Sequence, residues 1–77
     1  MDSEKVRNDI SYITKTTTAR LNYRTSCNLE KSSIAGVLEL GESVKIIDGW
    51  QKFAHGHTWF KAKIGRKYYY VCADWLV

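Results

Sequence analysis

From Tyr12 onward the chain is a series of short β-type segments separated by turn signals, and this pattern restricts the choice of fold more than any other feature. Val, Ile, Thr, Tyr, Phe and Trp dominate this part of the sequence, whereas helix-period patterning is nearly absent. Residues 59–64 alternate between two faces, as a half-buried strand does. The dipeptide Asp48-Gly49 is a strong hairpin signal, because glycine tolerates positive φ without steric cost. The pattern predicts an all-β domain.

The length of the chain limits it to one domain with a small core. A chain of 77 residues buries only about 60% of the surface that its unfolded form exposes. Such a core leaves no room for a deep catalytic cleft with its supporting residues, which favours a binding module over an enzyme. The net charge of +4 favours a negatively charged partner, such as a Gram-positive wall or a nucleic acid. The lysines are spread along the chain, so we interpret most of them as solvated strand faces.

Six short segments, in this order and at these spacings, carry a resemblance to a known family. They are 21–24 (LNYR), 34–38 (IAGVL), 40–47 (LGESVKII), 59–63 (WFKAK) and the closing pairs 70–71 (YV) and 75–76 (WL). Together they resemble the bacterial SH3-like (Src-homology-3-like) domain, the small β-barrel appended to many cell-wall hydrolases. The resemblance covers roughly residues 12–77. The glycine dipeptide that usually follows the first motif is absent, and Thr25-Ser26-Cys27-Asn28 stands in its place.

The resemblance implies a small SH3-like β-barrel, and the alternation with its closely spaced turn signals predicts that this barrel is partly open and has five to seven strands. Residues 25–33 are polar and rich in turn formers, and they correspond to the long RT-type loop of the family. A short 3₁₀ turn is expected over residues 74–76, near the C-terminus. The connection that leads to Trp59 is longer than the family usually allows, which predicts a protruding hairpin or an extended loop. Residues 1–11 are interpreted as a linker or N-terminal extension, although Val6 and Ile10 at i, i+4 also allow a helical turn.

Domains of this family bind peptidoglycan through its stem peptide or cross-bridge, while a separate domain of the same protein supplies hydrolysis. The resemblance therefore implies a non-catalytic targeting module, without a cofactor, at the bacterial cell wall. No signal peptide and no transmembrane segment is visible in the sequence, so we expect no membrane partner. A secreted or phage-released parent protein is expected to carry the domain outside the cell.

Aromatic residues are the best candidates for the walls of a ligand groove, because they offer a large contact area with few rotors. The alternation places Trp59 on the face opposite Phe60 and Tyr70 on the face opposite Val71, and Trp75 follows the last strand. The predicted walls are Trp59, Tyr70 and Trp75. The predicted polar contacts, all at outward or loop positions, come from Asn22, Arg24, Thr25, Asn28 and Glu30. The predicted core contains Leu21, Tyr23, Ile46 and Val71.

The sequence has features of three other functional classes. A eukaryotic-type SH3 domain usually has an acidic RT loop, but the loop here contains Glu30 as its only acid, beside Lys31. A nucleic-acid-binding barrel is supported by basic residues interleaved with aromatic ones, although wall binding is favoured over it. Self-association through an edge strand also remains open.

Cysteines and histidines provide no recognisable catalytic or metal motif. Cys27 and Cys72 do not form a C-x-x-C pair, and free, partly buried thiols are favoured over a disulfide. His55 and His57 flank a glycine, but no run of cysteines or histidines lies nearby in sequence, so both are interpreted as exposed loop residues. A Cys27–histidine nucleophile lacks an orienting group. We therefore predict neither catalytic residues nor a metal site.

Overall fold

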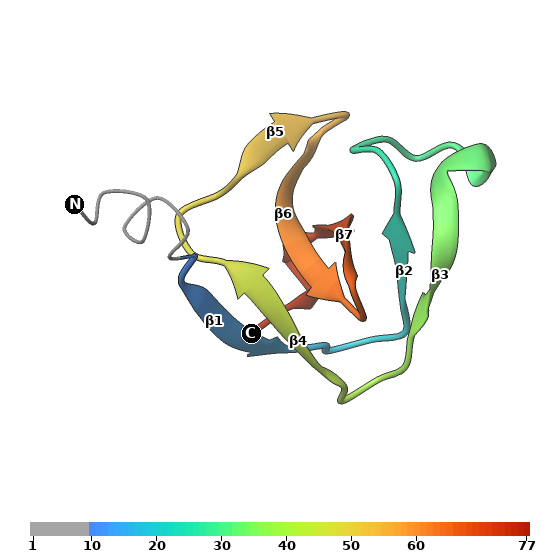
Figure 1. Cartoon of the computed structure of the whole chain (residues 1–77). Helices are drawn as coiled ribbons and strands as arrows, with labels where there is room; N and C mark the ends of the chain where they lie inside the picture. Colours follow the sequence, from blue (N-terminus) through green and yellow to red (C-terminus); the bar gives the residue numbers. More distant parts are fainter. Residues whose placement is uncertain (1–9) are drawn as a thin grey trace.

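A computed structural model describes residues 10–77 of the chain (Figure 1). The strands are β1 (Tyr12–Thr16), β2 (Leu21–Arg24), β3 (Ile34–Leu38), β4 (Ser43–Ile47), β5 (Lys52–Ala54), β6 (His57–Ile64) and β7 (Lys67–Cys72). Two 3₁₀ helices complete the list, η1 (Lys31–Ser33) and η2 (Ala73–Trp75). The all-β prediction is confirmed, and so are the strand number and the 3₁₀ turn near the C-terminus. Most of the predicted linker, residues 1–9, lies outside the described residues.

The strands form one antiparallel sheet in the order β1-β4-β6-β7-β2-β3, with β5 paired to β6 outside this path. Figure 1 shows the strands arranged around a common interior. The two ends of the order, β1 and β3, do not pair with each other. The sheet is therefore not closed, as a partly open arrangement requires, and a barrel is not confirmed.

The free edge of β1 is covered in part by the last residues of the described chain. Thr16 and Val77 exchange two backbone hydrogen bonds of 2.8 and 3.0 Å, and the Thr18 amide donates to the Trp75 carbonyl at 2.8 Å. Thr17 and Leu76 form an isolated β-bridge between these bonds. We call this arrangement the terminal clasp. It joins the first strand to the segment that follows η2.

The connection that leads to Trp59 folds as the tight hairpin β5–β6. His55 and Gly56 form its two-residue turn with φ of 53° and 77°. Positive φ at both positions is typical of the type I′ turn, which matches the twist of paired strands. Of the two predicted alternatives, a hairpin or an extended loop, the structure shows the hairpin.

Asp48-Gly49 forms a turn but not a hairpin, which corrects the sequence prediction. The Trp50 amide donates to the Ile47 carbonyl at 3.2 Å, and Gly49 has a φ of 84°. However, β4 and β5 on either side of the turn do not pair with each other. Both strands pair with β6, β4 near its end and β5 near its start. The turn therefore leads the chain from one part of β6 to another.

The core lies between the strands and includes three of the four residues predicted for it, Leu21, Ile46 and Val71. The fourth, Tyr23, is half-buried and packs against this cluster. Its ring also lies in edge-to-face contact with Tyr69, with the centroids 4.8 Å apart. Tyr23 stands opposite Gly36 in the β2–β3 pair, and its ring covers the glycine.

We expect Gly36→Ala to destabilise the domain by about 1–2 kcal/mol, because an added Cβ would collide with the hydroxyl and ring of Tyr23. The neighbouring Tyr69 limits how far that ring can move away. Urea denaturation of the variant measures the effect. In a Tyr23→Val background the same change should be neutral or stabilising, since glycine in a strand is otherwise less favourable than alanine. An equal loss in both backgrounds would contradict this explanation.

Candidate functional site

Two pockets border the loop of residues 25–33. The loop pocket has a volume of about 200 Å³ and is lined by Thr25, Ser26, Cys27, Trp50, Lys52 and Tyr70. The tryptophan pocket, also about 200 Å³, is lined by residues that include Arg20, Asn22, Leu29, His57, Trp59 and Trp75. Both pockets lie where strand β2 leads into the loop.

Six of the eight predicted ligand-binding residues line one of these pockets. They are Asn22, Arg24, Trp59 and Trp75 in the tryptophan pocket and Thr25 and Tyr70 in the loop pocket. Asn28 and Glu30 line neither. The Asn28 side chain instead accepts a hydrogen bond of 3.0 Å from the Glu30 amide, which stabilises the loop from within. The structure thus brings most of the predicted set together but separates it into two pockets.

Trp59 is not an exposed groove wall, which corrects the prediction for this residue. It does lie on the face opposite Phe60, but that face is covered here, and only 1% of its surface is exposed. Its register partner is Cys72 on β7, and its indole Nε1 donates a hydrogen bond of 2.8 Å to the Ala54 carbonyl of β5. Trp59 therefore forms the floor of the tryptophan pocket and belongs to the core.

Arg24 is also not free to meet a ligand. Its guanidinium is buried, and Nη1 donates to the Glu30 carbonyl at 2.8 Å and to Ser33 Oγ at 3.0 Å. The Thr25 amide adds a bond of 2.8 Å to the Ser33 carbonyl. Arg24 thus holds the two ends of the loop together, a structural role that its outward position in the alternation concealed.

The exposed aromatic surface of the site comes from Trp75, Tyr70 and Trp50. Trp75 is 48% exposed at the end of η2. Trp50 and Tyr70 are half-buried, with ring centroids 5.4 Å apart, and the Lys61 ammonium lies 6.0 and 5.8 Å from these two centroids. Trp50 was not among the predicted site residues. Its position directly after the Asp48-Gly49 turn could have indicated a partly exposed side chain, since a large aromatic residue at a turn is seldom fully buried.

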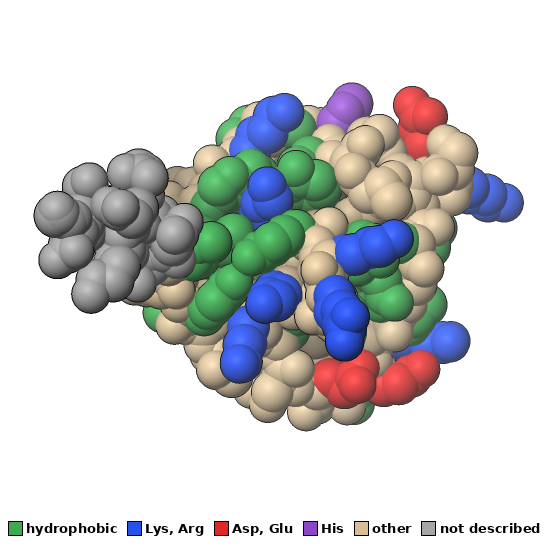
Figure 2. Space-filling view, in the orientation of Figure 1, with side chains coloured by type: hydrophobic (Ala, Val, Ile, Leu, Met, Phe, Trp, Pro, Cys, Tyr) green, Lys and Arg blue, Asp and Glu red, His purple; other side chains and the backbone are tan. Residues whose placement is uncertain are grey.

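A larger hollow of about 500 Å³ lies at another part of the sheet, bordered by Tyr12, Leu38, Lys45, Lys63 and Ile64 among others. None of the predicted site residues lines it. We favour the two loop pockets as the recognition site despite their smaller volume, because they combine tryptophan and tyrosine rings with the polar groups of the loop. Figure 2 shows Lys and Arg side chains scattered among hydrophobic ones on the displayed face, as predicted for solvated strand surfaces.

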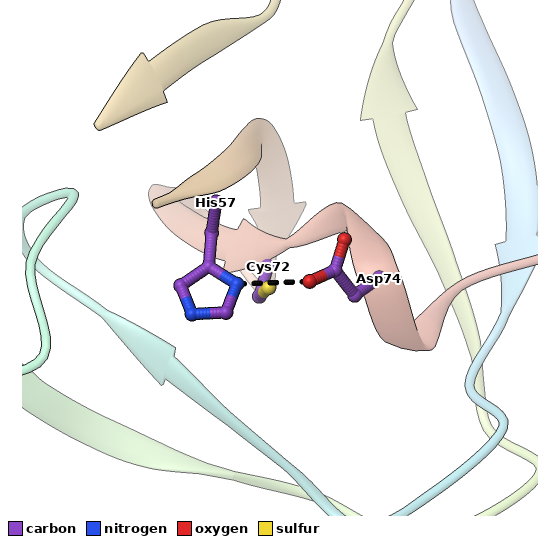
Figure 3. A group of neighbouring side chains, drawn as sticks. All are labelled: His57, Cys72 and Asp74. Atoms are coloured by element: carbon purple, nitrogen blue, oxygen red, sulfur yellow. Dashed lines mark hydrogen bonds and ion pairs between the residues drawn. The ribbon is translucent and has the colours of Figure 1, made fainter. Parts of the chain in front are cut away.

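His57 departs from the prediction that both histidines are exposed loop residues. His55 is exposed in the turn, but His57 begins β6 and is half-buried. Its Nδ1 lies 2.8 Å from Asp74 Oδ2, and these two atoms and the Cys72 sulfur all lie within 4.8 Å of one another (Figure 3). The sequence did not reveal this cluster because it depends on the register of β6 and β7.

Both cysteines are free, as favoured from the sequence. Burial raises the pKa of the Cys72 thiol and also that of the Cys27 thiol. At Cys27 the positive charge of the nearby Lys52 offsets part of this rise in pKa. A raised pKa favours the protonated thiol, which is a weak nucleophile.

Within the part of the chain that the structure describes, no helix is long and apolar enough to cross a membrane. Comparison of the chain with protein-family models, with curated proteins and with solved structures gave no match.

Proposed function

We propose that this domain is a non-catalytic module that binds the peptide part of peptidoglycan at the loop pockets. Exposed aromatic side chains beside the 25–33 loop are the observation that carries the proposal. Trp75 borders the tryptophan pocket, and Trp50 and Tyr70 border the loop pocket. The sequence resemblance places a ligand at this loop, so the two arguments agree on location.

The chemistry of the pockets suits a peptide with few side chains. Stem peptides and cross-bridges rich in glycine and D-residues offer mainly backbone amides for recognition. Aromatic rings provide flat apolar contact with such a backbone, and polar groups at the rim satisfy its amides. Asn22, Thr25 and Lys52 supply such groups here, from β2, the loop and β5.

The partner of the module is a peptidoglycan hydrolase domain in the same protein, which acts at the bacterial wall. Tethering to the wall raises the effective concentration of substrate for the attached enzyme without any new contact to its active site. A modest affinity of the module for the wall is sufficient for tethering. Such an affinity agrees with shallow pockets of about 200 Å³.

We expect Trp75→Ala to weaken binding to purified Gram-positive walls by about thirtyfold, equivalent to about 2 kcal/mol for a hot-spot aromatic residue. Trp75 is half exposed, so its removal should leave the fold intact. Co-sedimentation with walls over a range of protein concentrations measures the change. Leu40→Ala is the matched control, because Leu40 is 68% exposed and lines none of the pockets described above.

Two outcomes would count against wall binding. One is retention of the parent domain on walls at the level of an inert protein. The other is equal retention of the folded Trp75 variant and the parent. Release of reducing sugar or free amines by the domain alone would overturn the non-catalytic assignment.

Nucleic-acid binding is the second candidate, favoured by Lys61, whose ammonium lies within 6.0 Å of the ring centroids of Trp50, Tyr68 and Tyr70. Cationic and aromatic groups so close together can contact phosphates and stack with bases. Binding of this kind weakens steeply with salt as counterions are released, whereas peptide binding depends less on salt. Titration of single-stranded DNA and of walls at two salt concentrations separates the two functions.

A further inference from the structure

Three side chains with metal-binding atoms converge at the end of the sheet where β6 begins and η2 follows β7. They are His57, Cys72 and Asp74, and they provide an imidazole nitrogen, a sulfur and a carboxylate oxygen. Figure 3 shows the imidazole and the carboxylate pointing toward each other, with the sulfur beside the line that joins them. No function proposed above uses this group of three.

The register of the two strands explains why these residues meet. Cys72 pairs with Trp59, and strands β6 and β7 are antiparallel. His57 lies two residues before Trp59 on β6, and Asp74 lies in η2, the 3₁₀ turn that directly follows Cys72. Residues two apart on a strand share a face, so His57 is on the same face as Trp59 and Cys72. The β-ladder therefore positions His57 and Cys72, and the 3₁₀ turn η2 brings Asp74 to them.

We propose that His57, Cys72 and Asp74 form a site for a zinc ion. Nitrogen, thiolate and carboxylate ligands are those that Zn²⁺ accepts, and zinc sites with three protein ligands and one open position are common. The bond lengths of tetrahedral zinc separate its ligand atoms by about 3.3–3.6 Å. The three ligand atoms here lie within 4.8 Å of one another. Small side-chain rotations that move each atom by about 1 Å bring them to the distances that zinc requires.

The charges also agree with a divalent ion. A thiolate and a carboxylate balance the two positive charges of Zn²⁺, so the occupied site is neutral beside the buried guanidinium of Arg24. Asp74 is exposed and Cys72 is buried, which gives the ion both an entry side and a sheltered side. His57 and Cys72 also line the tryptophan pocket, so the fourth position is open to water there. The ion would join the start of β6 to η2, and this role does not depend on wall binding.

Titration of the chelator-treated, tag-free chain with Zn²⁺ by isothermal titration calorimetry tests the site. We expect one ion per chain. His57→Gln and Asp74→Asn should each weaken binding by at least about tenfold, since even outer partners of metal ligands cost that much. His55→Gln is the matched control, because His55 is exposed in the same hairpin and is not one of the three converging residues.

Co²⁺ provides a second readout that reports the sulfur ligand directly. We expect a thiolate-to-cobalt charge-transfer band in the parent and in Cys27→Ser, and its loss in Cys72→Ser. Circular dichroism confirms that each variant is folded before its binding is compared. The site is overturned if the folded parent binds no Zn²⁺ saturably or if His57→Gln and Asp74→Asn both retain the parent affinity. It is equally overturned if no thiolate band forms or if the band survives in Cys72→Ser.

Discussion

Trp59→Ala is expected to destabilise the domain by about 3–5 kcal/mol, the usual cost of removing a large buried aromatic side chain. Trp59 is 1% exposed, and the change also leaves the Ala54 carbonyl without its hydrogen bond from the indole. Small domains have a total stability of about 0.05–0.15 kcal/mol per residue, so a loss of this size removes a large part of it. Urea denaturation followed by tryptophan fluorescence measures the free energy of unfolding.

Phe53→Ala is the matched control for this prediction. Phe53 is an aromatic residue on the adjacent strand β5, but it is 74% exposed, so its truncation should change stability by less than about 0.5 kcal/mol. If Trp59→Ala proves as harmless as Phe53→Ala, then Trp59 is not part of the core. A loss of wall binding in the Trp59 variant is informative only where folding is retained.

Arg24→Ala is expected to cost about 2–3 kcal/mol, because hydrogen bonds from a charged donor are stronger than neutral ones and their buried partners would be left unsatisfied. The partners are the Glu30 carbonyl and Ser33 Oγ, which lie at the far end of the 25–33 loop. Hydrogen exchange should show faster exchange of the Thr25 amide, which bonds to the Ser33 carbonyl.

Arg20→Ala separates this structural effect from a general loss of positive charge. The side chain of Arg20 is 70% exposed, and its ion pair with Glu39, at 3.4 Å, is of the surface type. Such pairs contribute about 0–1 kcal/mol, so a small effect is expected. Equal stability of the Arg24 and Arg20 variants would show that the guanidinium of Arg24 does not hold the loop.

The sequence was sufficient to predict the strands because their signals are local. Alternation, β-branched residues and glycine turns each act within a few residues, and the strands from β1 to β7 follow them. The order of the strands in the sheet could not be predicted in the same way, because it depends on which strands meet after the whole sheet has twisted. The Asp48-Gly49 turn shows the same limit: its conformation was predictable, but the partners of the strands on either side of it were not.

The exposure of a site residue could be predicted where it follows from the position of that residue along a strand. It could not be predicted where a neighbouring element covers the side chain. Trp75 follows the last strand and is exposed as predicted. Trp59 was assigned to the correct face, but β5 and η2 cover that face. Arg24 has a charge, which usually indicates exposure, yet its hydrogen bonds to the loop make burial favourable. The meeting of His57 with Asp74 depends on strand register, which single-residue patterns do not contain.

The terminal clasp has a consequence for the order of folding. It pairs residues 16–18 with residues 75–77, which are separated by nearly the full length of the domain. During synthesis residues 16–18 therefore lack this partner until residues 75–77 have left the ribosome, and contacts so distant in sequence form slowly. An unpaired strand edge invites pairing with other chains. Truncation after Asp74 is therefore expected to leave the outer side of residues 16–18 without its partner and to make the domain more prone to aggregation.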